Sequence, residues 1–543
     1  MTFFIGVDVG TGSARAAVFD ANGRMLSSHK HDIQMWRDGA DTAEQSSDDI
    51  WHAVCTCIRE ALAAAEVSAD QIAGLGFDAA CSMAVLGEDM RPLSVSASGD
   101  PVRNVIVWMD QRAKAQAHRI NVQGHAVLDY VGGRISPEMQ TPKLLWLKEE
   151  QPERFARAAQ FFDLPDFLTW KATGSLARSA CTVTCKWTYL AHEARWDPTY
   201  FHQIGLGVLA DEGFARIGQE IVPPGTPLGQ GLTEEAAAEC GLRPGTPVGA
   251  ALIDAHAGGV GTVGAAGGAG PEATMAYVFG TSACTMATSA KPHKVPGVWG
   301  PYYSAMVPGM WLSEGGQSAA GEAIAHLTAK HPAGPAAKEM ALGKGLSLQA
   351  YLLRTLDQRV DVPSDAARFA ESRVIVPDLI GNRAPFADPD ARAVIAGLSL
   401  DQGFDDLLAT YVATVLGVGY GLRQIMAAQK ARGVCPSAIV ISGGAAQSTT
   451  IQQLLADAGG YRVQSPASPE PVLLGSAMLG AVASGHAPRL QDAMTKMSKI
   501  DQTFTPSVPH AALHDRRFEA FQMLQKADRL ARGLGADQLP QSG

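Results

Sequence analysis

Two short passages of this chain share one pattern, an apolar strand that runs directly into a turn of small residues. The first is Ile-Gly-Val-Asp-Val-Gly-Thr-Gly-Ser-Ala-Arg at residues 5–15, and the second is Tyr-Val-Phe-Gly-Thr-Ser-Ala-Cys at residues 277–284. Glycine in such a turn leaves backbone N–H groups uncovered, so that an anion can approach them. One turn in each half of the 543 residues predicts two similar domains that hold a polyphosphate such as ATP between them.

The composition limits the classes of partner and the location. Hydrophobic residues make up 46% and charged residues 18% of the chain, which is typical of a folded globular protein. A net charge of −10 without a basic stripe argues against nucleic acid and anionic membranes as partners. No apolar run reaches the roughly 18–20 residues that span a bilayer, and the chain starts with a strand pattern rather than a signal peptide. We therefore expect a cytoplasmic protein.

The spacing of apolar residues predicts mixed sheets rather than a purely parallel one. Strands over 3–9, 14–19 and 24–33 are separated by short turns, and a helix over 47–65 leads to a strand over 72–77. Three consecutive strands, a helix and a returning strand give both antiparallel and parallel pairs. The pattern then restarts, and the further elements predicted are strands near 274–288, 300–307 and 438–442, helices within 318–360, and an amphipathic helix over about 515–533.

Residues 261–271 have the composition of a hinge, because glycine and alanine dominate them. We therefore expect an N-terminal domain over 1–262 and a C-terminal domain over 263–543. The cleft between the two domains would then lie next to this hinge.

The first turn carries side chains that suit phosphate or a metal ion. Asp8 ends a buried strand, where a carboxylate is costly unless it is paired or lies near a metal. Thr11 and Ser13 can present hydroxyl groups to a phosphate. The alternative is an ordinary hairpin that Asp8 caps, but the similar turn at Gly280 favours phosphate binding.

A second group of candidate residues follows the apolar strand 105–107. If the segment is extended, alternation places Trp108, Asp110 and Arg112 on one face. These side chains suit a polyol, because an indole ring can cover C–H faces while the charged groups bind hydroxyls. The alternative is a surface ion pair beside a core tryptophan.

Asp254 ends a third apolar strand, and a glycine-rich helix start follows it. A carboxylate at this point can accept the proton of an attacking hydroxyl, a role worth roughly 10²–10⁴-fold in rate. Its place just before the hinge predicts that it faces the cleft. His256 would either contact the substrate or lie in the core.

Two further glycine-rich segments differ in what they predict. Residues 442–448 join a buried strand to a helix, and glycine there lets an adenosine approach the backbone. Residues 470–481 place small residues at helical spacing, which predicts close helix packing. Residues 259–264 match G-x-G-x-x-G, but they open no βαβ unit and no acidic residue follows about 20 positions later. A dinucleotide site is therefore not expected.

Taken together, these segments resemble the FGGY family of carbohydrate kinases over nearly the whole chain. The similar pieces, in order, are Asp8–Ser13, Trp108–Arg112, Pro142–Leu147, Asp254–Gly258, Gly280–Ser282, Gly381–Pro385 and Gly443–Ala445. The resemblance implies the two-domain actin, Hsp70 and sugar-kinase fold. This is an α/β, ribonuclease H-like architecture with duplicated mixed sheets, helices on both faces and a central cleft that holds ATP and a sugar.

The resemblance also implies roles for individual residues. Asp254 would be the catalytic base, and Asp8 would hold Mg²⁺ through water. The residues implied in sugar binding are Cys81, Ser82, Trp108, Asp110, Arg112, Lys186, His256 and Glu314. The residues implied in ATP binding are Thr11, Gly12, Ser13, Arg15, Gly280, Thr281, Ser282, Gln317, Gly443, Gly444, Ala445 and Gln447.

Within the family, the chain is similar to the ribulokinase-like pentulose kinases around residues 185–187, 254–256 and 299–318. Kinases that act on D-ribulose carry Thr-Cys-Ser where this chain has Ala-Cys-Ser at residues 80–82, so one hydroxyl is missing. We expect phosphorylation of D-ribulose to D-ribulose 5-phosphate. L-Ribulose and ribitol are the alternative substrates, and a sugar-sensing or chaperone-like ATPase is the non-kinase alternative. The sequence leaves the oligomeric state open, a homodimer included.

Overall fold

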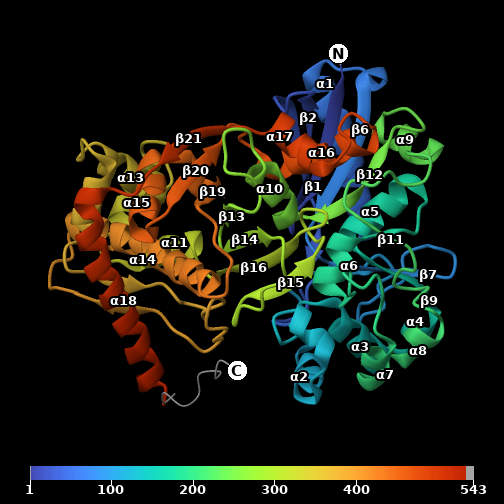
Figure 1. The fold of residues 1–543 in the computed structure, drawn as a ribbon, viewed down its shortest axis with the longest axis horizontal. Coiled ribbons are helices and arrows are strands. Elements are labelled where there is room, and N and C mark those ends of the chain that lie inside the picture. The colour runs from blue at the N-terminus through green and yellow to red at the C-terminus, as the bar shows by residue number, and fades with distance from the viewer. Residues whose placement is uncertain (1, 534–543) are drawn as a thin grey trace.

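Two mixed sheets, one in each half of the chain, form the frame of the molecule (Figure 1). The computed structural model describes residues 2–533, apart from the side chains of Ala445 and Ala446. In the first sheet the strand order is β12-β6-β1-β2-β3. β1 pairs antiparallel with β2 and parallel with β6. The strands are β1 (Phe3–Val9), β2 (Ser13–Asp20), β3 (Met25–Asp32), β6 (Ile72–Ala79) and β12 (Val248–Ile253).

The second sheet repeats this arrangement at its centre. Its order is β15-β16-β14-β13-β19-β20-β21, and β13 pairs antiparallel with β14 and parallel with β19. The strands are β13 (Thr274–Phe279), β14 (Ala283–Ser289), β15 (Trp299–Tyr303), β16 (Trp311–Gln317), β19 (Ala438–Gly443), β20 (Arg462–Pro466) and β21 (Ile500–Phe504). The duplicated mixed sheets that the sequence predicts are therefore confirmed.

Helix α1 (Ser47–Ala65) covers one face of the first sheet. Ser46 caps it, since its hydroxyl accepts a hydrogen bond from the Asp49 N–H at 3.3 Å. Apolar residues of α1 share one core with Ile5 and Val7 of β1. The intervening residues of β1 point to the opposite face, because side chains alternate along a strand.

Helix α16 (Pro471–Ala483) covers that opposite face, although it belongs to the second half of the sequence (Figure 1). Glycines on the strands make this packing close. A Cβ atom on Gly6 would lie 1.9 Å from the Leu473 carbonyl oxygen, and one on Gly76 would lie 1.9 Å from that of Ser476. Any side chain at these positions would push the helix away. α16 also packs against α10 (Asp254–Val263), so this helix pair lies between the two sheets.

A third sheet, with order β4-β5-β8-β7-β9, lies beside the first. Its strands are β4 (Met35–Trp36), β5 (Glu44–Gln45), β7 (Met83–Gly87), β8 (Val105–Ile106) and β9 (Ala158–Asp163). The pair β10 (Arg178–Ser179) and β11 (Ile221–Val222) follows. The other helices of this half are α2 (Lys114–Gln123), α3 (Gln140–Glu150), α4 (Pro152–Arg157), α5 (Leu164–Thr173), α6 (Ala180–Lys186), α7 (Pro198–Gln203), α8 (Gly207–Asp211) and α9 (Glu234–Cys240).

The second half has its own core, in which β13 and the long helix α14 (Phe404–Lys430) both take part. The antiparallel pair β17 (Val374–Val376) and β18 (Val394–Ala396) packs on this core, and a long loop joins the two strands. The other helices of this half are α11 (Gly321–Lys330), α12 (Gly334–Leu342), α13 (Leu348–Asp357), α15 (Thr449–Gly459), α17 (Leu490–Met497) and α18 (Ala511–Ala531).

One local prediction is wrong. The sequence predicts that residues 105–112 stay extended, but β8 ends at Ile106 and a turn follows, in which the Asp110 N–H donates to the Val107 carbonyl at 3.0 Å. Trp108, Asp110 and Arg112 therefore do not share one face of a strand. Within residues 2–533, no helix is both long and apolar enough to cross a membrane.

Candidate active site

A cavity of about 360 Å³ lies where the two halves of the chain meet, and both halves line it. Its walls bring together many of the residues that the sequence predicts as functional. From the first half these are Asp8, Thr11, Arg15, Cys81, Trp108, Lys186 and Asp254, and from the second half Gly280, Thr281, Ser282 and Glu314.

A backbone hydrogen bond from the first glycine closes each of the two turns, although the first turn is one residue longer than the second. In the first, the Gly10 N–H donates to the Ser13 carbonyl at 3.0 Å, and in the second the Gly280 N–H donates to the Ser282 carbonyl at 2.9 Å. Each turn follows the central strand of its sheet and faces the cavity. The two turns thus offer uncovered backbone and hydroxyl groups to one ligand from two sides.

Asp8 and Arg15 form a charged pair beside the first turn. Nε of Arg15 donates to Oδ2 of Asp8 at 2.8 Å, and Nη1 reaches Oε2 of Glu470 at 2.8 Å. Behind this pair lies the fully buried Asp78, which accepts a hydrogen bond from the Ser476 hydroxyl. Burial and the neighbouring Asp8 carboxylate raise the pKa of Asp78 well above its ordinary value.

Asp254 is the first residue of α10 and directly follows β12, as its sequence pattern predicts. Its Oδ1 accepts a hydrogen bond from the Ala255 N–H at 2.7 Å, and the side chain lines the cavity. Burial, followed by the charge of Asp8, raises the pKa of Asp254 to about 6. A carboxylate with this pKa is ionised at neutral pH and still basic enough to accept a proton.

Lys186, Glu314 and Trp299 gather at another part of the cavity wall. Nζ of Lys186 lies 5.5 Å from the centre of the Trp299 ring. Burial alone would raise the pKa of Glu314. The hydrogen bond from His256 and the charge of Lys186 outweigh burial and lower this pKa to about 2. This wall therefore offers a carboxylate, an ammonium group and an aromatic face, a combination that can bind a polyhydroxylated molecule.

His256 lies behind this wall, because its side chain is buried and does not line the cavity. Its Nε2 is 3.3 Å from Oε2 of Glu314, and its Nδ1 is 3.1 Å from Sγ of Cys181. The geometry favours the core alternative for His256, with Glu314 as the group that it orients.

Of the predicted residues in segment 108–112, one lines the cavity and two do not. Trp108 lines the cavity, and its indole N–H donates to Oγ1 of Thr11 at 2.9 Å. Ser82 lies behind it and accepts the Trp108 backbone N–H at 3.1 Å. Asp110 and Arg112 form a buried ion pair at 2.8 Å and lie away from the cavity wall.

Several residues implied in ATP binding also lie off the cavity wall, namely Gly12, Ser13, Gln317, Gly443, Gly444 and Gln447. The side chain of Gln317 has protein partners, since it accepts from the Tyr277 hydroxyl at 2.6 Å and donates to the Val418 carbonyl at 2.9 Å. Gly443 pairs with Phe279, directly before the second turn. Gly443 therefore lies at the same end of the sheet as that turn. The side chain of Ala445 is outside the described part of the chain.

Comparison with known proteins assigns the chain to a family. The N-terminal domain of the FGGY family of carbohydrate kinases matches residues 3–261, and the C-terminal domain matches residues 275–484. This chain belongs to the FGGY family of carbohydrate kinases. Kinases of this family use ATP.

Individual relatives agree with this assignment. The chain is 44% identical to the FGGY carbohydrate kinase domain-containing protein of Homo sapiens, over 96% of this chain and 95% of that protein. It is 36% identical to a D-ribulokinase of Saccharomyces cerevisiae, over 93% of this chain and 75% of that protein. A solved xylulose kinase from Lactobacillus acidophilus has a TM-score of 0.79 at 19% identity, covering 97% of this chain and 98% of that one, and therefore shows the same fold.

Among the cavity-lining residues of this FGGY kinase that were not predicted, four have a polar or aromatic side chain: Glu138, Cys284, Trp299 and Arg383. Trp299 and Arg383 fall in segments that already resemble the family, so closer attention to those segments could have found them. Glu138 lies in a loop before α3, where no periodic pattern marks it. Glu470, the second partner of Arg15, belongs to a segment for which only packing was predicted.

Proposed function

We propose that this kinase transfers the γ-phosphoryl group of ATP to a terminal hydroxyl of a pentulose, with D-ribulose as the substrate. The supporting observation is the single cavity in which two phosphate-type turns, an acid at Asp254 and a polyol-type wall at Lys186 and Glu314 meet. The similarity to a D-ribulokinase over most of both chains supports the choice of pentulose.

In the proposed reaction, Asp254 acts as the base. The hydroxyl oxygen of the sugar forms a bond to the γ-phosphorus while the bond to the oxygen that bridges to the β-phosphate breaks, and ADP leaves. The hydroxyl proton passes to the Asp254 carboxylate. Because phosphoryl transfer needs little covalent help, the enzyme contributes mainly position and charge.

The two turns would bind the phosphates from opposite sides. Thr281 and Ser282 offer neutral donors from the second half, and Thr11 offers its hydroxyl from the first. Arg15 brings a guanidinium to the same wall, where its bonds to Asp8 and Glu470 fix its direction. A positive group so placed neutralises charge on the phosphates.

The residues beside the first turn fit Mg²⁺ held through water. Among the described residues, no group of three His, Cys, Asp or Glu side chains could cage a metal ion. Mg²⁺ keeps several of its waters and needs one or two carboxylates together with phosphates, and Asp8 lines the cavity as such an oxygen donor. When bound, Mg²⁺ would neutralise charge on the phosphate oxygens.

The acceptor would lie against Trp108, Lys186 and Glu314, with Cys81 and Ala80 on the same cavity. Ala80 stands where kinases similar to this chain carry threonine for D-ribulose, so the cavity wall lacks that hydroxyl. Because this hydroxyl is missing, L-ribulose and ribitol are the alternative substrates that we propose.

The test is ATP-dependent turnover with Mg²⁺ across D-ribulose, L-ribulose, D- and L-xylulose, ribitol, erythritol and glycerol. We expect kcat/KM for D-ribulose to exceed that for every other acceptor by at least about tenfold. A preference for ribitol or L-ribulose would overturn the substrate and retain the chemistry. Turnover that no sugar stimulates would instead support a sugar-sensing or chaperone-like ATPase.

A further inference from the structure

Arg383 brings a guanidinium group to the cavity from the loop between β17 and β18. Its Cζ lies 5.8 Å from the centre of the Trp299 ring, and its Nη1 lies 3.9 Å from Sγ of Cys284. In the part of the chain that the structure describes, no carboxylate forms an ion pair with it. A guanidinium has five N–H donors, so most of those of Arg383 remain available to oxygen atoms of a bound molecule.

Backbone hydrogen bonds hold the middle of the loop that carries Arg383. On the cavity side, the Ala384 N–H donates to the carbonyl of Gly316 on β16 at 3.2 Å. On the far side, Asn382 and Asp388 exchange backbone hydrogen bonds of 2.8 and 2.9 Å and so close the loop. The side chain of Asn382 also accepts the Phe386 N–H at 3.2 Å. Arg383 directly follows Asn382, so its backbone lies next to the hydrogen bonds that close the loop.

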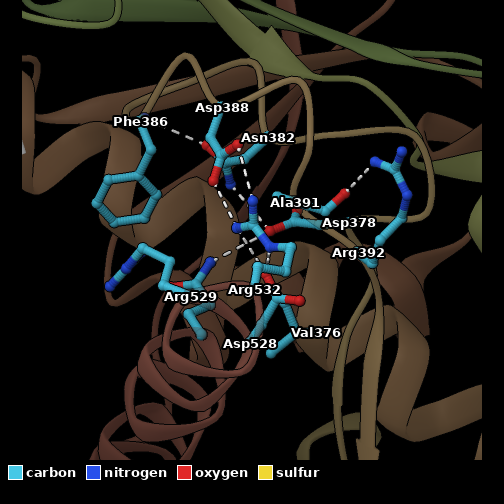
Figure 2. Close-up of a pocket in the computed structure, with 11 residues that line it drawn as sticks. Val376, Asp378, Asn382, Phe386, Asp388, Ala391, Arg392, Asp528, Arg529 and Arg532 are labelled. Carbon is cyan, nitrogen blue, oxygen red and sulfur yellow. Dashed lines mark hydrogen bonds and ion pairs between the residues drawn. The ribbon is translucent and has the colours of Figure 1, made fainter. Parts of the chain in front are cut away.

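Residues at the C-terminal end of helix α18 contact this loop on the side away from the cavity, as Figure 2 shows. Arg532 binds both carboxylate oxygens of Asp388, at 2.7 and 3.3 Å, and Asp528 holds the same guanidinium at 2.8 Å. Arg529 lies 4.7 Å from the centre of the Phe386 ring. The enclosed space is about 10 Å³, which is too small for any ligand larger than water. This contact is therefore a clamp rather than a binding site.

We propose that Arg383 is an acceptor-binding residue and that Arg532 positions it by clamping the loop at Asp388. The proposal rests on the proposed function, since it names a further contact of the same acceptor site. Arg383 reaches the wall where Trp299 and Glu314 lie, and its donors match hydroxyl and carbonyl oxygens of a sugar. A two-point bond between a guanidinium and a carboxylate fixes direction as well as distance, which is what a positioning contact requires.

The main experiment measures KM for D-ribulose and KM for ATP in Arg383→Gln and Arg532→Gln. We expect Arg383→Gln to raise KM for D-ribulose roughly tenfold or more, because a hydrogen bond from a charged group to the sugar is lost. Arg532→Gln should raise the same KM about three- to fivefold. KM for ATP should stay within about twofold in both, since binding of ATP uses the other wall. An unchanged KM for D-ribulose in Arg383→Gln would overturn the proposal.

Two further variants separate positioning from general stability. Asp515→Asn breaks the ion pair that α18 forms with Arg423 at 2.7 Å, away from the loop, and should leave KM for D-ribulose unchanged. In the double variant, Arg532→Gln should add nothing to Arg383→Gln, because both act through one contact. Additive effects would show that Arg532 does not act through Arg383.

Failure of the proposed function would look different. If the enzyme prefers another acceptor of the sugar panel to D-ribulose, the ratios of variant KM to wild-type KM are measured with that acceptor. If no sugar is phosphorylated, calorimetric titration with D-ribulose provides the readout. Binding by the wild-type protein that Arg383→Gln weakens supports the contact without turnover, and equal binding or no binding overturns it.

Discussion

The two strand-turn-strand units at the centre of the sheets have similar strand pairing, but the first carries charged side chains where the second carries neutral ones. In the first, Asp8 pairs with Arg15 on one neighbouring strand and with Asp78 on the other. In the second, the corresponding position is Val278, which pairs with Cys284 and Ser442. Each charged or acidic residue of the first unit thus has a neutral counterpart in the second.

The contrast extends to the strand that lies two places from the central strand, beyond its parallel neighbour, in each sheet. β12 ends directly before Asp254, whereas β20, which has the same place in the second sheet, ends at Pro466 and no acid follows it at once. Both units provide a phosphate-type turn, and the acids Asp8 and Asp254 come from the first half. The second half adds its ionisable groups, Glu314, Arg383 and Glu470, from segments outside its own central unit. We infer that the two units supply a similar frame, and that the two acids proposed to act in the reaction, Asp8 and Asp254, were placed on the first half of it.

Removing the acid that follows β12 should have the largest effect. We expect Asp254→Asn to lower kcat by roughly 10²–10⁴-fold, because the hydroxyl proton loses its acceptor. Steady-state kinetics with D-ribulose and ATP measure this, and an unchanged melting temperature serves as the control. A variant with near-normal kcat would exclude Asp254 as the base.

Making the first unit more like the second should have the next largest effect. We expect Asp8→Asn to lower activity about 10- to 100-fold, the usual range when a group that orients a metal's ligands is lost. The loss should be smaller at high Mg²⁺ concentration, which a Mg²⁺ titration of kcat/KM measures. A loss that Mg²⁺ does not relieve would assign Asp8 to the orientation of Arg15 alone.

Making the second unit more like the first should weaken the binding of ATP. In Val278→Asp an unpaired carboxylate would face the phosphates, and we expect KM for ATP to rise roughly tenfold or more. Val278→Asn is the matched control, since it has nearly the same shape without the charge. Equal effects of the two variants would point to shape rather than charge.

The smallest effect concerns pH. Burial and the charge of Asp8 raise the pKa of Asp254 to about 6, and the ionised form is the active one. Activity should therefore fall as the pH drops through 6, by about tenfold per pH unit below it. In Asp8→Asn the acid limb should shift to lower pH, because a negative neighbour is gone. A pH profile of kcat/KM for the sugar measures both, and an unshifted limb would contradict coupling between the two acids.

The sequence predicted the two repeated strand-turn-strand units better than it predicted the residues that line the cavity. β1, β6 and β13 follow from local apolar patterns, and the glycine turns follow from the residues directly after them. The interpretation of Asp110 and Arg112 as cavity residues assumed an extended segment, and a turn after Ile106 removed its basis.

Residues supplied by loops could not be predicted from local pattern. Glu138 and Arg383 reach the cavity because distant elements hold their loops, and no periodicity marks such positions. The roles of the site residues are predictions that the variants above test, and the domain boundary between 262 and 263 stays a prediction.

The close contact between α16 and the glycines of the first sheet has a consequence for biosynthesis. Strands β1 and β6 leave the ribosome early, but the helix that covers their glycine-bearing face is made only after most of the chain. That face stays bare through much of translation, and exposed apolar strands are prone to aggregation. The N-terminal half therefore cannot complete its folding as an independent unit on the ribosome, and it must wait for the segment beginning at Pro471.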